Sequence, residues 1–124
     1  MLSVVITPAG GPEDLASLFA RLVPAAVDGL VREVIFAGLA DADIGRICEA
    51  TGARVAAGLD AALGEAKGPW VLLAPATFRP PDDWQDRAAA HVAHRSGSLK
   101  IKGARTGGLF TRSPSAELRP LQAR

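Results

Sequence analysis

One stretch near the middle of the chain, residues 69–84 with the sequence PWVLLAPATFRPPDDW, most constrains the fold. Its apolar run at 71–74 is short and unbroken, which is typical of a strand buried on both faces of a parallel sheet. The proline pair at 80–81 excludes a helix before residue 82. The stretch therefore predicts a central strand, an exposed loop and a helix that begins near Trp84.

The loop after this strand lies where open α/β sheets bind their ligands, at the carboxyl ends of the strands. Residues 74–79 read Ala-Pro-Ala-Thr-Phe-Arg and contain no carboxylate, His or Cys. Arg79 is the one charged group placed to meet a phosphate. The sequence thus predicts the position of a ligand-binding crevice, but its central loop has few side chains that could take part in catalysis or bind a metal.

Strands and helices alternate through the first 95 residues. Apolar and β-branched runs predict strands, helical spacing of apolar residues predicts helices, and Gly or Pro separates them. The predicted strands are 2–7, 31–37, 53–56 and 70–74, and the predicted helices are 15–22, 41–51, 59–66 and 84–95. Pro24 is expected to end or kink the first helix. This alternation predicts an α/β fold with a mainly parallel, doubly wound sheet and helices on both faces.

The pattern changes after Ser96. Residues 98–102 and 108–111 predict two short strands of an edge hairpin separated by a Gly-rich turn. Residues 113–124 have weak periodicity and two prolines, so we expect an extended or mobile tail. We therefore divide the chain into a main domain, 1–95, and a C-terminal hairpin with a basic extension, 96–124.

Charge is distributed unevenly over the 124 residues. Residues 1–94 carry 7 basic and 12 acidic side chains, whereas residues 95–124 carry 7 basic and 1 acidic. A basic tail can contact nucleic acid, anionic lipid or an acidic protein surface, and it can also dock on the acidic body of its own chain. We favour docking on the body, and we do not expect nucleic-acid binding, because no aromatic residues are interleaved with the basic ones.

The composition indicates a soluble protein of a reducing compartment. The longest apolar run is far too short to span a bilayer, and the N-terminus lacks the pattern of a signal peptide. The one cysteine, Cys48, cannot form an internal disulfide and fits a helix as a small buried hydrophobe rather than as a reactive thiol. We therefore expect a cytoplasmic protein without a membrane span.

Several short segments, in order and spacing, resemble the family 2 glycosyltransferases, which use the GT-A nucleotide-sugar-binding fold. They are VVITPAGG at 4–11, VREVIFAGLADAD at 31–43, GARV at 52–55, AKGPW at 66–70 and PPDDW at 80–84. The resemblance covers about residues 1–95. It implies a GT-A/Rossmann-like fold and a nucleoside diphosphate sugar as ligand.

The chain departs from the family pattern at the positions that carry its chemistry. In the family, an acidic residue at the end of the second strand contacts the base; here Gly38 stands in that place and only Asp43 remains of the motif. The family's D-x-D motif follows the fourth strand and bridges a divalent metal to the diphosphate. Here the corresponding residues are 74–76, Ala-Pro-Ala. The family's acceptor half, with its catalytic base, would need a longer chain.

The glycine loop at 8–12 is one candidate binding element. Backbone amides of Gly10 and Gly11 before a helix could cradle a phosphate, but the loop lacks the Lys and Ser/Thr of a P-loop, and a plain turn is the favoured interpretation. Asp41 and Asp43 lie near the crevice, and helix capping explains them better than ligand binding.

Two other pairs have a similar ambiguity. Asp82 and Asp83 lie at a helix start, where capping explains them, and a displaced metal site is the alternative. His91 and His94 have the i, i+3 spacing of a metal pair, but no third ligand is visible, so a surface role is favoured.

These observations leave three hypotheses. The first is a degenerate glycosyltransferase-like protein without metal-dependent catalysis that acts as a binding or structural subunit. The second is an active nucleotide-sugar transferase that needs a partner for its acceptor half, and only this hypothesis requires Mg²⁺ or Mn²⁺. The third is a small nucleotide- or anion-binding module. The expected nucleotide-binding residues are Pro8, Gly10, Gly11, Gly38, Asp41, Asp43 and Arg79. A protein partner or oligomer is expected to use an exposed sheet edge and the basic tail.

Overall fold

Strand β1 (Leu2–Thr7) is the centre of a parallel arrangement. It pairs in parallel with β2 (Val31–Ala37) on one side and with β4 (Trp70–Pro75) on the other. Strand β3 (Arg54–Ala56) continues the sheet beyond β2, also in parallel. The computed structural model describes residues 1–94, 97–105 and 113–121. Within them the carboxyl ends of β1 to β4 share one edge of the sheet, as the sequence predicts.

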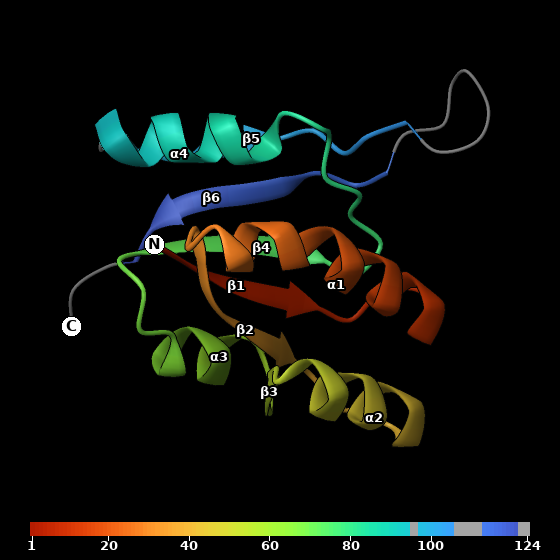
Figure 1. Ribbon diagram of the computed structural model, residues 1–124. Helices are drawn as coiled ribbons and strands as arrows, with labels where there is room; N and C mark the ends of the chain where they lie inside the picture. The colour runs from red at the N-terminus through yellow and green to blue at the C-terminus, as the bar shows by residue number, and fades with distance from the viewer. Residues whose placement is uncertain (95–96, 106–112, 122–124) are drawn as a thin grey trace.

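Helices cover both faces of this sheet (Figure 1). On one face, α1 (Pro12–Val27), α2 (Ala42–Thr51) and α4 (Trp84–His94) pack against the larger part of the core. On the other face, α3 (Leu59–Glu65) covers a smaller cluster of apolar residues. Alternate residues of β1 point to the two clusters, with Val4 in the larger and Val5 in the smaller, and both are fully buried. The predicted α/β fold is confirmed.

Local sequence signals explain where the helices begin and end. The Asp41 carboxylate accepts a hydrogen bond of 2.9 Å from the Ile44 amide and caps α2. Gly52 ends the same helix in the left-handed conformation, at φ 78°. Pro24 lies inside α1, which continues to Val27, so the helix does not end at the proline. Pro24 is exposed, and Ala25 beside it is buried against the sheet, which keeps the last turn in place.

The C-terminal part of the chain adds two antiparallel strands. Strand β6 (Ala116–Pro120) pairs antiparallel with β4, and β5 (Leu99–Ile101) pairs antiparallel with β6, which gives the order β3-β2-β1-β4-β6-β5. Of the predicted extended or mobile tail over 113–124, β6 is extended, and the mobile alternative is wrong for it, because its Leu118 is fully buried. The predicted strand at 98–102 is confirmed by β5, and the predicted strand at 108–111 lies outside the described residues.

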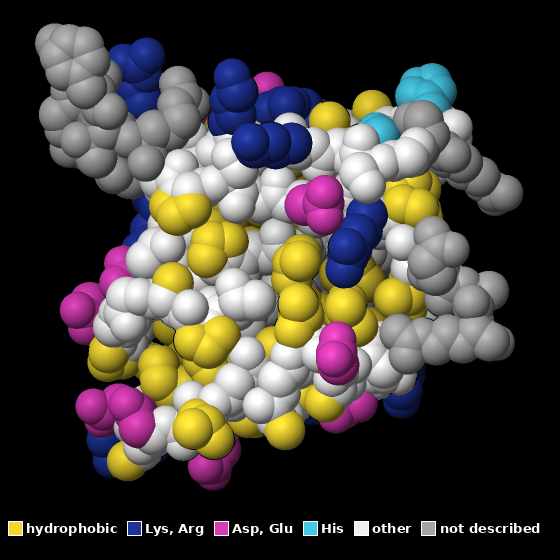
Figure 2. Space-filling model, turned by 180° about the vertical axis from the view of Figure 1, so that it is seen from behind, with side chains coloured by type: hydrophobic (Ala, Val, Ile, Leu, Met, Phe, Trp, Pro, Cys, Tyr) yellow, Lys and Arg dark blue, Asp and Glu magenta, His cyan; other side chains and the backbone are white. Residues whose placement is uncertain are grey.

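The surface on the far side of the molecule from α1 carries both hydrophobic and charged side chains (Figure 2). Figure 2 shows hydrophobic side chains across the middle of this face and Lys and Arg side chains along its upper edge. No helix among the described residues is long and apolar enough to cross a membrane. The division at residues 95 and 96 stays a prediction, although β6 and β4 belong to one sheet.

Candidate functional site

The loops that follow β1 and β4 meet at the carboxyl edge of the sheet. The Ala76 amide donates a hydrogen bond of 3.0 Å to the Thr7 carbonyl, which joins the two loops directly after the strands end. The loop that follows β2 packs directly against the loop that follows β1. A Cβ added to Gly38 would lie 2.5 Å from Cγ of Pro8, so there is no room for a side chain at this position. The structure therefore places Pro8, Gly38 and the 76–79 loop at the same edge of the sheet. This agrees with the prediction that the carboxyl ends of neighbouring parallel strands lie side by side.

Arg79, the residue expected to meet a phosphate, is bonded within the protein. Its Nη2 donates a hydrogen bond of 2.8 Å to Asp14 Oδ1, and its Nη1 donates to the carbonyls of Ala76 and Phe78 at 3.1 and 3.0 Å. The Arg79 side chain is 13% exposed and that of Asp14 is 31% exposed. The guanidinium thus ties the β4 loop to the start of α1.

The glycine loop before α1 surrounds the same carboxylate. The Gly11 amide donates to Asp14 Oδ2 at 3.0 Å. Gly10 has φ 64°, and a Cβ there would lie 2.1 Å from Asp14 Oδ2 and 2.9 Å from Cγ2 of Thr77. The Asp14 carboxylate therefore occupies the place beside the helix N-terminus where an external anion would bind.

Asp14 is the site residue that sequence reasoning misses. Its position as the third residue of a helix that begins with Pro12 is a recognisable capping signal. Its contact with Arg79 joins positions 65 residues apart, and no local pattern predicts such a pair.

The other acidic candidates are explained locally. Asp41 caps α2, and Asp43 forms an exposed ion pair with Arg46. Asp82 and Asp83 lie in the turn before α4 and are exposed. Asp83 stands at the cap position, because its carbonyl accepts a hydrogen bond of 3.1 Å from the Arg87 amide, but within the described residues neither carboxylate bonds to the start of that helix. The binding roles predicted for Asp41 and Asp43 stay predictions.

A hollow of about 500 Å³ lies beside the carboxyl ends of β1 and β4, on the side of the sheet that carries α3. Its floor includes Leu73 and Pro75, and its polar groups include Thr7, Lys100 and Glu117. Lys100 and Glu117 are cross-strand partners of β5 and β6. Because β6 was not predicted, no pattern in the sequence indicated this hollow. It could hold an anionic group at Lys100, with Glu117 limiting the net positive charge.

Metal-binding side chains are not grouped in the described part of the chain. No cluster of three or more His, Cys, Asp or Glu residues capable of holding an ion occurs there. His91 bonds through Nε2 to the Gly97 carbonyl, and its ring packs edge-on against Trp70. Cys48 is buried, and burial raises the pKa of its thiol, which is consistent with a structural role.

A separate polar cluster lies at the opposite, amino edge of the sheet. Glu33 Oε2 accepts hydrogen bonds from Ser3 Oγ at 2.5 Å and from the Lys67 amide at 2.6 Å, and Oε1 pairs with Arg54. Burial raises the pKa of Glu33, but these two hydrogen bonds and the positive charges of Arg54 and Arg32 outweigh it and lower the pKa below 4.5. The cluster joins three strands and the loop before β4, so its role is structural.

Comparisons with known proteins identify the fold. No protein-family model and no curated protein matches the chain. Two solved structures of glucosyl-3-phosphoglycerate synthase from Mycobacterium tuberculosis are similar to it. One is a complex with Mn²⁺, UDP and glucosyl-3-phosphoglycerate, and the other contains Mn²⁺, UDP and phosphoglyceric acid.

The similarity extends over nearly the whole chain at low sequence identity. The TM-scores are 0.64 and 0.61, and the identities are 19% and 20%. The matches cover 97% and 96% of this chain but 56% and 55% of the synthase chains, so the chain spans little more than half of their length. At this identity the likeness concerns the fold alone. The chain therefore has an α/β fold that resembles the GT-A glycosyltransferase fold of these synthases.

Proposed function

We propose that this chain is a glycosyltransferase-like protein that does not perform metal-dependent catalysis and acts as a binding or structural subunit. The fold supports the glycosyltransferase-like part of the proposal. The carboxyl edge of the sheet supports the absence of metal-dependent catalysis, because no group of metal-binding side chains occurs there among the residues that the structure describes.

The residues that end β4 do not fit Mn²⁺ or Mg²⁺. These hard cations prefer oxygen ligands, chiefly carboxylates. Ala74, Pro75 and Ala76 supply no side-chain oxygen. Asp14 is the carboxylate that the structure shows bonded to this loop, and both of its oxygens already accept hydrogen bonds, from Gly11 and Arg79. A cation bound to Asp14 would be repelled by the Arg79 guanidinium, which already neutralises the charge of this carboxylate.

The Asp14–Arg79 pair is the observation that carries the proposal. A diphosphate at this edge would compete with a half-buried carboxylate of the same chain for Arg79 and for the start of α1. The pair therefore opposes nucleotide binding in the place where the fold would offer it, and favours a role that does not require the nucleotide.

A subunit role requires a partner, and the sheet leaves room for one. Strand β5 is an edge strand, and Lys100 and the following Lys102 are exposed. Of the other basic tail residues, Arg95, Arg112 and Arg124 lie outside the described residues. We assign the partner contact to the outer side of β5 and its lysines, since no described strand pairs with that side and a charged strand edge can accept another chain.

Isothermal titration of the purified chain with UDP and GDP, with and without Mn²⁺, tests the proposal. Glucosyl-3-phosphoglycerate synthase from Mycobacterium tuberculosis, crystallised with both UDP and Mn²⁺, is the positive control. We expect no binding that Mn²⁺ strengthens. Binding that tightens about tenfold or more with Mn²⁺ would overturn the proposal and favour an active transferase. Binding that ignores Mn²⁺ and is lost in Arg79→Ala would instead favour the small anion-binding module.

A further inference from the structure

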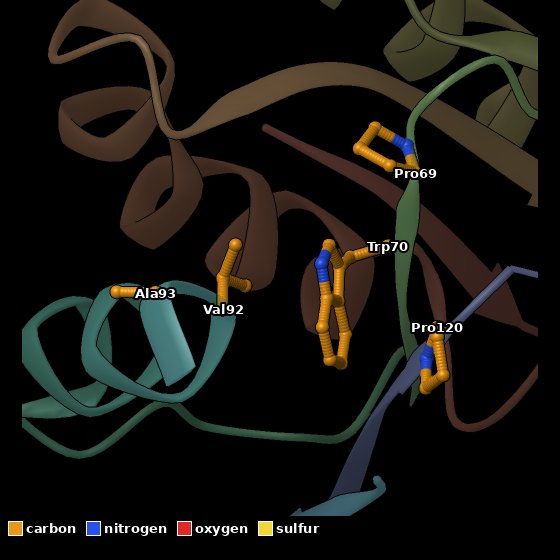
Figure 3. Close-up of a pocket in the computed structure, with 5 residues that line it drawn as sticks. All are labelled: Pro69, Trp70, Val92, Ala93 and Pro120. Atoms are coloured by element: carbon orange, nitrogen blue, oxygen red, sulfur yellow. The ribbon is translucent and has the colours of Figure 1, made fainter. Parts of the chain in front are cut away.

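A second hollow, of about 650 Å³, lies at the amino end of β4, at the opposite edge of the sheet from the candidate site. Figure 3 shows its lining, which comes from the start of β4, the end of α4 and the end of β6. The lining residues are Pro69, Trp70, Val92, Ala93 and Pro120. The volume is in the range of small-molecule sites, and none of these side chains is charged.

The indole of Trp70 supplies the only side-chain hydrogen-bonding group of this lining. The residue is 6% exposed, and no residue that the structure describes accepts a hydrogen bond from its Nε1. No fully buried side-chain nitrogen among the described residues lacks a partner, so this nitrogen is partly open to solvent. Figure 3 places it on the edge of the ring that is turned toward Val92.

The orientation of this indole is fixed by its surroundings. The His91 ring packs against it edge-on, with 5.5 Å between ring centroids and 78° between ring planes. His91 is itself held by the Gly97 carbonyl, and the Trp70 backbone pairs with Leu2 of β1. A donor held in one orientation loses little freedom when an acceptor binds, which favours recognition.

We propose that this hollow is a binding site for a small, flat, uncharged molecule that carries one hydrogen-bond acceptor. The apolar ring of the ligand packs between the two prolines and Val92, and its acceptor receives the Trp70 N–H. In the free protein this nitrogen is open to water, so a ligand that covers it must supply an acceptor itself or leave a buried donor unsatisfied, which is costly. Charged ligands are disfavoured, because none of the described lining residues carries a charge and their desolvation would not be compensated. This proposal does not depend on the proposed function.

Titration of ¹⁵N-labelled protein with acetophenone, followed through the indole N–H signals, tests the site. The chain has two tryptophans, and Trp84→Phe assigns the signals. We expect the Trp70 signal to shift downfield and to saturate at a dissociation constant of about 1 mM, as befits a fragment of this size. Toluene, which has the ring without the acceptor, and benzoate, which carries a charge, should each bind at least about tenfold more weakly.

Two variants at exposed positions of α4 test the site without disturbing the buried core. Ala93→Phe fills the hollow, and Ala89→Phe places the same side chain one turn away, outside the lining. We expect at least about a tenfold loss of acetophenone affinity in Ala93→Phe and none in Ala89→Phe. A Trp70 signal that does not move, that moves equally with toluene, or that responds unchanged in Ala93→Phe would overturn the proposal.

Discussion

Glu33 shows how one partly buried carboxylate can join distant parts of this chain. Its oxygens accept bonds from Ser3 on β1, from Arg54 on β3 and from the amide of Lys67 before β4. A charged acceptor forms stronger hydrogen bonds than a neutral one, so the ionised form of Glu33 is the one that the fold stabilises.

We expect Glu33→Gln to lower the free energy of unfolding at pH 7 by about 1–3 kcal/mol, because the amide nitrogen cannot accept either of the bonds made to the oxygen it replaces. The pKa of Glu33 is lowered on folding, so its contribution is present above the unfolded value of 4.5 and is lost as the pH falls through the lower folded value. The difference between wild type and variant should therefore shrink below pH 4.5. Urea unfolding at a series of pH values measures it.

Glu49→Gln is the matched control, since Glu49 is exposed on α2. It should change stability by no more than about 0.5 kcal/mol at any pH. A Glu33→Gln variant as stable as wild type at pH 7 would show that the cluster does not hold the strands together.

At the scale of elements, β6 carries more of the fold than its sequence suggests. We expect Leu118→Ala to lower the free energy of unfolding by about 2–4 kcal/mol, because Leu118 is fully buried between β4 and β5 and its removal leaves a cavity. Glu117→Ala, one residue away on the exposed face of the same strand, should cost less than about 0.5 kcal/mol. Thermal unfolding compares the two, and equal effects would argue that β6 is not part of the sheet in solution.

The elements up to α4 could be predicted from the sequence because their signals are local. The β-branched run of β1, the Asp41 cap and the Gly52 stop each act within a few residues. Strand β6 could not be predicted, because AELRP has only two inward-facing residues and includes a proline, and its pairing with β4 is determined across a long stretch of chain. The residues of the candidate site differ in the same respect: local interactions could be predicted, and long-range ones could not. Asp41 was predicted as a cap, whereas the Asp14–Arg79 pair needs the fold to bring its members together.

At the scale of the whole molecule, the side of β5 that pairs with no described strand predicts association. We expect light scattering to give a mass above the 12.8 kDa of one chain, or a second protein to co-purify with it. The double substitution Lys100→Glu with Lys102→Glu should lower the associated fraction, because it reverses the charge beside the edge strand. Arg21→Glu, an exposed position on α1, is the control and should leave association unchanged. A monomer that co-purifies with nothing would contradict the assigned partner contact.

The place of β6 within the sheet also bears on how the chain is made. A ribosome delivers β1 to β4 first, and then α4 and β5, before the strand that separates β4 from β5. Until residue 120 has left the exit tunnel, β4 has one unpaired side and Leu72 lacks its neighbour on β6. The nascent chain therefore exposes one side of an apolar strand, the kind of surface that aggregates or binds chaperones, and slow translation of the segment after β5 would prolong that exposure.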